Sequence, residues 1–129
     1  MNRILVFLSL IFFLSCSKGP GEGGNSSIYG KIWVKNLNGA LQLINEYPGF
    51  DQEVYIIYGD ETGPSDRIRA NDQGEFEFKY LRPGKYRIYV YSEDSVAPLP
   101  VPNKISISKD LKVTSKKQKV DAGKITIYK

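Results

Sequence analysis

The stretch that decides the fold is DQGEFEFKYLRPGKYRIYV, residues 72–90. Its first half alternates charged and aromatic side chains, which predicts a strand with Phe76, Phe78 and Tyr80 on its inward face. The residues LRPG at 81–84 supply turn chemistry, because proline restricts φ and glycine accepts left-handed conformations. Residues 85–92 alternate again, so the stretch predicts a β-hairpin. Its second strand directs Tyr86, Ile88 and Val90 inward and Arg87, Tyr89 and Tyr91 outward.

Outside this hairpin, the chain carries further strand signals of period two. Residues 28–35 place Ile28, Gly30, Ile32 and Val34 on one face, and further strands are predicted at 54–58, 66–70, 104–108 and 120–128. A phase slip at Ala122-Gly123 predicts a β-bulge in the last strand. Proline cannot donate to a sheet hydrogen bond, so Pro98, Pro100 and Pro102 indicate a loop. The expected fold is an all-β, approximately seven-stranded Greek-key β-sandwich.

The segment 72–90, together with IYGKIWV at 28–34, resembles the signature of prealbumin-like sandwiches. That group includes the regulatory-like domain of carboxypeptidases, the B-type repeats of collagen adhesins and starch-binding-like folds. The shared pattern is Asp, Gly, alternating aromatics, Leu-x-Pro-Gly, then Tyr and alternating aliphatics. The resemblance implies a prealbumin-like fold but carries little about function, because the pattern forms a hairpin and a core.

Residues 36–52 depart from this family, which usually joins its first two strands by a short loop. The insert contains apolar side chains at Leu41, Leu43, Ile44, Tyr47 and Phe50. Apolar loop residues usually pack inward, so we expect the insert to cap one end of the sandwich. A ligand-binding loop is the alternative.

The N-terminus carries a short apolar run that ends at a cysteine. Arg3 precedes an apolar and small-residue run at 4–15, which is too short for a membrane span but typical of a secretory signal. The run ends at Cys16, the only cysteine, and resembles a lipobox, although Phe13 and Leu14 depart from its preferred residues. Residues 1–15 are therefore predicted to be a lipoprotein signal peptide and Cys16 the lipidation site. An ordinary cysteine, in a signal cleaved elsewhere or in an uncleaved anchor, is the alternative.

The predicted partner of Cys16 is a membrane, which its acyl chains would enter. Residues 16–26 are nearly free of apolar side chains and are predicted to form a flexible tether, with 27–129 as the β-sandwich domain. Ser17 stands where an aspartate would favour retention at the inner membrane of some Gram-negative bacteria. The expected location is thus the cell envelope, at the outer membrane.

Composition excludes several kinds of chemistry. The chain has no histidine, which excludes Ser-His-Asp, Cys-His and histidine-containing zinc sites, and no cofactor or metal site is predicted. Four carboxylates in adjoining segments could in principle serve a hydrolase or bind calcium, but turns use the same residue types: Asp60, Glu61, Asp66 and Asp72. The net charge of +4 comes from interleaved acidic and basic residues, and an exported protein rarely meets nucleic acid, so that partner is not expected.

The candidate binding face consists of outward side chains on two predicted strands: Tyr29, Trp33, Arg87, Tyr89 and Tyr91. If those strands were neighbours in one sheet, they would form an aromatic platform with a basic rim, suited to a sugar or a protein partner. The alternative is cross-strand aromatic pairing that stabilises the sheet. A lysine-rich segment at 109–119 could attract anionic lipid, or could be a solvated turn.

These patterns favour a non-enzymatic, lipid-anchored envelope protein that acts as a binding or structural accessory module. A carbohydrate-binding lipoprotein is the first alternative and a hydrolase the second.

Overall fold

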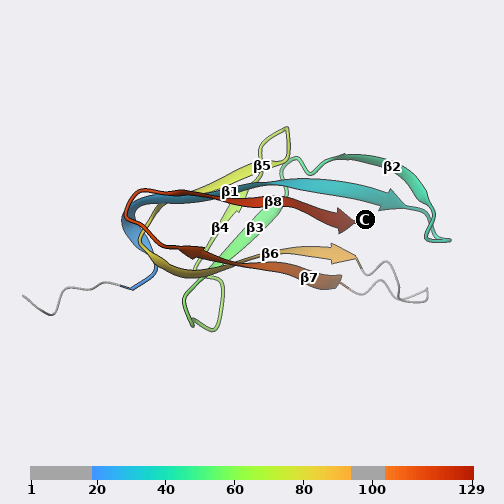
Figure 1. Cartoon of the computed structure of the whole chain (residues 1–129). Helices are drawn as coiled ribbons and strands as arrows, with labels where there is room; N and C mark the ends of the chain where they lie inside the picture. The colour runs from blue at the N-terminus through green and yellow to red at the C-terminus, as the bar shows by residue number, and fades with distance from the viewer. Residues whose placement is uncertain (1–18, 94–103) are drawn as a thin grey trace, which may run out of the picture.

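The computed structural model describes residues 19–93 and 104–129, and it is an all-β protein of two packed sheets (Figure 1). Sheet A contains β1 (Glu22–Leu37), β2 (Leu43–Pro48), β5 (Glu75–Leu81) and β8 (Lys119–Tyr128). Sheet B has the order β4 (Asp66–Arg69), β3 (Glu53–Tyr58), β6 (Gly84–Glu93), β7 (Lys104–Val113). All pairs are antiparallel except β1 with β8, which is parallel. The predicted β-sandwich class is confirmed, while its Greek-key and prealbumin-like character stays a prediction.

The core lies between the two sheets, and the inward faces predicted from alternation fill it. Every residue predicted to point inward from 28–34 and 85–90 is buried. The fully buried side chains come from both sheets: Ile28, Ile32, Val34, Leu81, Ile125 and Ile127 from sheet A, and Val54, Ile56, Tyr86, Ile88, Val90 and Val113 from sheet B. Burial of this continuous apolar layer is the main force that holds the sheets together.

Among the irregularities of sheet A, one was predicted from the sequence and another contradicts a prediction. The expected bulge is confirmed: β1 residues Tyr29 and Lys31 pair with Asp121 and Lys124 of β8, so one residue of β1 faces two of β8. Tyr80, in contrast, was predicted to point inward and is 68% exposed. Its φ of 61° interrupts the alternation of β5, and Leu81 is buried in its place.

The insert at 36–52 does not cap the sandwich, which corrects the prediction for that segment. It forms β2, an eighth strand that pairs with the second half of β1 and makes a hairpin extending beyond the body of the sandwich (Figure 1). Leu43, Ile44 and Phe50 are exposed. Tyr47 of β2 is partly buried and packs against the core. Backbone hydrogen bonds to a long partner strand position the rest of β2, so the exposed Leu43 and Ile44 need no place in the core.

β5 and β2 share one edge of β1, and Ile32 marks the change of partner. β5 pairs with β1 as far as Lys31, and β2 pairs from Trp33 onward. Between them, Ile32 donates its backbone N–H to the carbonyl oxygen of Gly74 at 2.7 Å and accepts from the N–H of Gly49 at 2.8 Å. Two loops therefore complete the ladder where neither strand does.

The predicted tether at 16–26 is also partly wrong. Glu22 to Ser26 belongs to β1, and Ser26 is buried. Backbone pairing explains this ordering of a polar segment, since Glu22 and Ser26 both lie opposite Leu81 of β5. Residues 16–18, the lipidation site among them, and the predicted signal peptide lie outside the described residues, as does the proline loop at 98–102.

Candidate binding face

The aromatic platform predicted from two neighbouring strands does not form. Tyr29 and Trp33 lie on the outer face of sheet A, because β1 belongs to it, whereas Tyr89 and Tyr91 lie on β6 of sheet B. The ring of Trp33 also makes cation–π contacts within its own sheet. The ammonium groups of Lys31 and Lys124 lie 5.9 Å and 5.4 Å from its centroid. The sequence established correctly that these side chains point outward, but not which sheet each strand joins.

Sheet B presents its own aromatic cluster, here termed the tyrosine face: Tyr55 of β3 with Tyr89 and Tyr91 of β6. Tyr55 pairs directly with Tyr89 across the two strands, and their rings stack with centroids 5.0 Å apart and planes 11° from parallel. The ring of Tyr91 meets both at steep angles, 5.5 Å from Tyr55 and 5.7 Å from Tyr89. Stacked and edge-to-face pairs of this kind stabilise a sheet.

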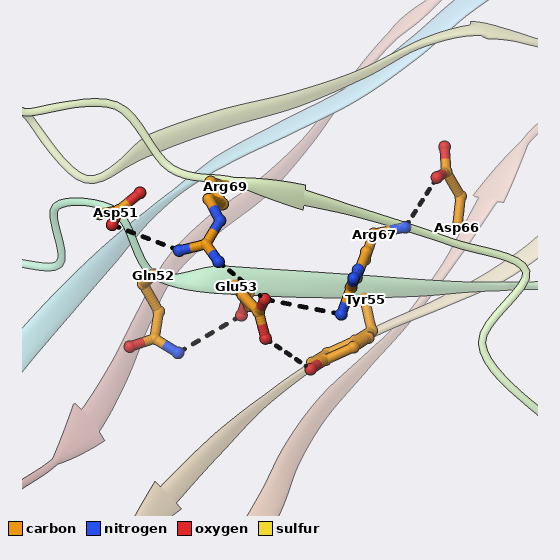
Figure 2. A network of polar contacts seen from close by, with 7 residues as sticks. All are labelled: Asp51, Gln52, Glu53, Tyr55, Asp66, Arg67 and Arg69. Atoms are coloured by element: carbon orange, nitrogen blue, oxygen red, sulfur yellow. Dashed lines mark hydrogen bonds and ion pairs between the residues drawn. The ribbon is translucent and has the colours of Figure 1, made fainter.

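A polar network holds Tyr55 in place on the face (Figure 2). The phenol of Tyr55 donates a hydrogen bond of 2.8 Å to Oε2 of Glu53, two residues earlier on β3. The other carboxylate oxygen of Glu53 forms ion pairs with two arginines of β4, Arg69 at 3.3 Å and Arg67 at 3.6 Å. Arg69 also pairs with Asp51 at 3.3 Å. Each ion pair is exposed and contributes little alone, but together they restrict the orientation of the ring.

Protonation states on the tyrosine face follow from these contacts. The hydrogen bond to Glu53 raises the pKa of Tyr55, and burial raises the pKa of Tyr89. Both shifts favour the neutral phenol, so these two rings carry no charge at neutral pH. The face therefore combines neutral aromatic surface with hydrogen-bond donors.

Arg87 was predicted as a positive rim for the platform, and the structure gives it a partner. Its guanidinium forms a bidentate pair with Asp110 of β7, Nε to Oδ1 at 2.6 Å and Nη2 to Oδ2 at 3.3 Å. That hydrogen bond lowers the pKa of the Asp110 carboxyl. The pair balances the charge, so Arg87 offers fixed donors more than net positive charge.

A shallow groove of about 250 Å³ runs beside the cluster. Ile57 and Arg87 line one part, the exposed edges of Tyr89 and Tyr91 another, and the hydroxyl groups of Ser106 and Ser108 the β7 side. The register explains this composition, because Tyr89 lies opposite Ser108 and Tyr91 opposite Ser106. Aromatic edges, hydroxyls and a guanidinium thus meet on one side of sheet B.

The acidic residues considered for catalysis do not converge. Asp60 and Glu61 lie in the loop after β3, where Glu61 accepts from the hydroxyl of Ser65. Asp66 accepts from the backbone N–H of Arg67, and Asp72 occupies the turn before β5. Within residues 19–93 and 104–129, no group of three acidic, histidine or cysteine side chains is arranged to hold a metal ion. The same ranges contain no helix long and apolar enough to cross a membrane.

Sequence reasoning missed Tyr55 and Glu53. Residues 54–58 are apolar on both faces, which predicts a central strand without indicating which side chains face outward. The missing information was register, because Tyr55 becomes part of a cluster only when it pairs with Tyr89.

A scan of protein-family models found no match, and neither did a search of curated proteins. Among solved structures, the chain is similar to a proposed carbohydrate-binding protein from Pseudomonas aeruginosa, with 11% identity, a TM-score of 0.49, and coverage of 84% of this chain and 91% of that one. It is also similar to a 9R-lipoxygenase from Cyanothece, with 17% identity, a TM-score of 0.39 and coverage of 98% of this chain. The chain spans only 20% of that enzyme. At these scores, functional inference rests on the residues of this chain.

Proposed function

We propose that this protein is a lipid-anchored, non-enzymatic module of the cell envelope that uses the tyrosine face of sheet B to bind a partner. The observation that carries the proposal is the ordered cluster of Tyr55, Tyr89 and Tyr91, which lies beside a groove lined by hydrogen-bond donors. Aromatic side chains lose little conformational entropy on binding when their rings are already held in place. A ligand would meet a rigid surface.

The anchor is proposed on the sequence of residues 1–16, which end at the sole cysteine. Replacement of this cysteine, Cys16→Ala, is expected to leave the precursor without lipid, because the chain has no other thiol to which the lipid could be attached. Mass spectrometry of the mature N-terminus in a bacterial host checks this directly. A wild-type mature N-terminus without added lipid mass would contradict the anchor.

A glycan is the second candidate function, as the ligand of the same face. The observation in its favour is the groove, where Ser106, Ser108 and Arg87 supply hydrogen bonds next to the ring of Tyr91, which is 46% exposed. Sugar rings bind where an aromatic surface lies beside such donors and acceptors. The platform that joined Tyr89 and Tyr91 to Trp33 is not part of this proposal.

Tyr91→Ala is expected to weaken binding of envelope oligosaccharides about tenfold, or about 1.4 kcal/mol, through loss of one aromatic contact. Titration calorimetry with neutral oligosaccharides and soluble peptidoglycan fragments measures the change. Tyr29→Ala is the matched control, since Tyr29 is 39% exposed on the opposite sheet. An equal loss in both variants, or no binding by the wild type, would count against a glycan ligand.

A further inference from the structure

The beginning of the described chain is attached to one end of the sandwich. Arg82 donates from Nε to the carbonyl oxygen of Gly19 at 2.7 Å, and from Nη1 to that of Glu22. The hydroxyl of Tyr86 accepts from the N–H of Gly21 at 2.9 Å and donates to the carbonyl oxygen of Arg82 at 2.5 Å. The chain from Gly19 onward is therefore held in a defined position rather than free to extend.

The turn between β7 and β8, residues 114–118, lies at the same end. Ser26 donates through Oγ to the carbonyl oxygen of Ser115 and accepts from the N–H of Gln118, both at 3.0 Å. Ser27 donates its N–H to the carbonyl oxygen of Gln118 at 2.8 Å. Figure 1 shows this turn and the start of β1 together on the left, opposite the C-terminus and the β1–β2 hairpin.

This turn carries an excess of positive charge. Lys116 and Lys117 are exposed, and no carboxylate of the described residues lies within ion-pair distance of either. Nearby, Lys79 and Lys119 share a single carboxylate, Glu77, at 3.7 Å and 3.9 Å. The depression beside this end is balanced in charge, because three basic and three acidic side chains line it: Lys85, Arg87, Lys112, Asp60, Glu61 and Asp110.

We propose that the 114–118 turn contacts the anionic phospholipid headgroups of the leaflet that holds the acyl chains of Cys16. This inference depends on the proposed lipid anchor and adds an orientation to it. Three residue steps separate Cys16 from Gly19, and a fully extended chain covers at most about 3.5 Å per step, or roughly 10 Å. That reach is close to the Debye length of about 8 Å at physiological ionic strength.

The short connection between Cys16 and Gly19 favours the bilayer as the surface that the turn contacts. A longer tether would let the domain turn freely, whereas a span of roughly 10 Å keeps Gly19 near the bilayer, so the charge of the 114–118 turn decides whether that turn faces the headgroups. Each lysine that lies near an anionic surface raises the equilibrium constant for contact roughly fivefold. Lys116 and Lys117 together therefore raise it about 25-fold. The tyrosine face and the β1–β2 hairpin then lie away from the headgroups, available to other molecules.

A spin label introduced by Ser115→Cys in the full-length, lipidated protein tests the proposal. Headgroup-chelated nickel speeds the relaxation of a nitroxide that lies near the bilayer surface. We expect strong relaxation in vesicles of phosphatidylcholine with phosphatidylglycerol, and weak relaxation in phosphatidylcholine alone or at high salt. The change Lys116→Glu with Lys117→Glu is expected to lower the equilibrium constant for contact between the turn and the headgroups at least 25-fold. The milder Lys116→Gln with Lys117→Gln serves if charge reversal prevents folding.

The matched control is Lys104→Glu with Lys129→Glu, which makes the same charge change at the opposite end of the sandwich. Its relaxation should equal that of the wild type. Relaxation that is the same in both vesicles, or that falls equally in both variants, overturns the proposed orientation and leaves the lipid anchor intact. Mass spectrometry on the same samples reports the anchor separately, and absence of lipid would refute both.

Discussion

Replacing Phe76 by alanine is expected to lower the free energy of unfolding by about 4 kcal/mol, the largest loss among the substitutions proposed for this protein. Phe76 is 5% exposed and its ring packs edge-to-face on Phe78. It lies opposite Gly30 of β1, where a β-carbon would come within 2.7 Å of the ring. Because Gly30 has no side chain to move inward, the space left by the ring would stay empty, and unrelaxed cavities carry the highest cost.

The measurement is denaturant unfolding followed by circular dichroism, with the midpoint and slope compared between variants. Tyr80→Ala provides the control, because Tyr80 lies on the same strand but is mostly exposed. Its effect should stay within about 0.5 kcal/mol, as is usual for surface substitutions. If Phe76→Ala lost less than about 1.5 kcal/mol, the aromatic contact across β1 and β5 would not be a major part of the core.

The features of this fold that sequence predicts well are those decided within a few residues. The hairpin at 72–90 has its alternation, turn and second strand in one stretch, and the structure confirms β5 and β6 there. The bulge at Ala122-Gly123 is also local, because a phase slip in the apolar pattern reveals it and Gly123 adopts a φ of 75°. Tyr80 shows the limit of such reasoning, since one residue with positive φ reverses the face of the next.

The features that sequence did not predict depend on partners distant along the chain. β2 has no regular apolar alternation and forms because β1 continues past the body of the sandwich and offers it an edge. The segment 22–26 has the composition of a linker, yet it pairs with Leu81, which follows it by more than fifty residues. The same holds for the site: Tyr89 was predicted to face outward, but only the pairing of β3 with β6 supplies Tyr55 as its neighbour.

Gly74→Ala is the second substitution with a large expected effect, a loss of about 2–3 kcal/mol in unfolding free energy. Gly74 has a φ of 75°, a left-handed conformation that costs a residue with a β-carbon about 1–2 kcal/mol. Space adds to this cost, because the new carbon would lie 2.5 Å from the carbonyl oxygen of Ile32 and 2.8 Å from the backbone nitrogen of Gly49. Both neighbours are backbone atoms and cannot rotate away.

Those two atoms are the groups through which β1 changes partner from β5 to β2, so the damage should extend beyond the turn. We expect faster amide hydrogen exchange at Ile32 and Gly49, whose N–H groups form the 2.7 Å and 2.8 Å bonds of the junction. Gly63→Ala is the matched control, because that glycine has open space around it and no positive φ. Its stability should be unchanged or slightly raised, through the lower entropy of the unfolded chain. Equal stability of the two variants would mean that the junction at Ile32 tolerates displacement, and that β2 is attached to the sandwich less firmly than its pairing with β1 implies.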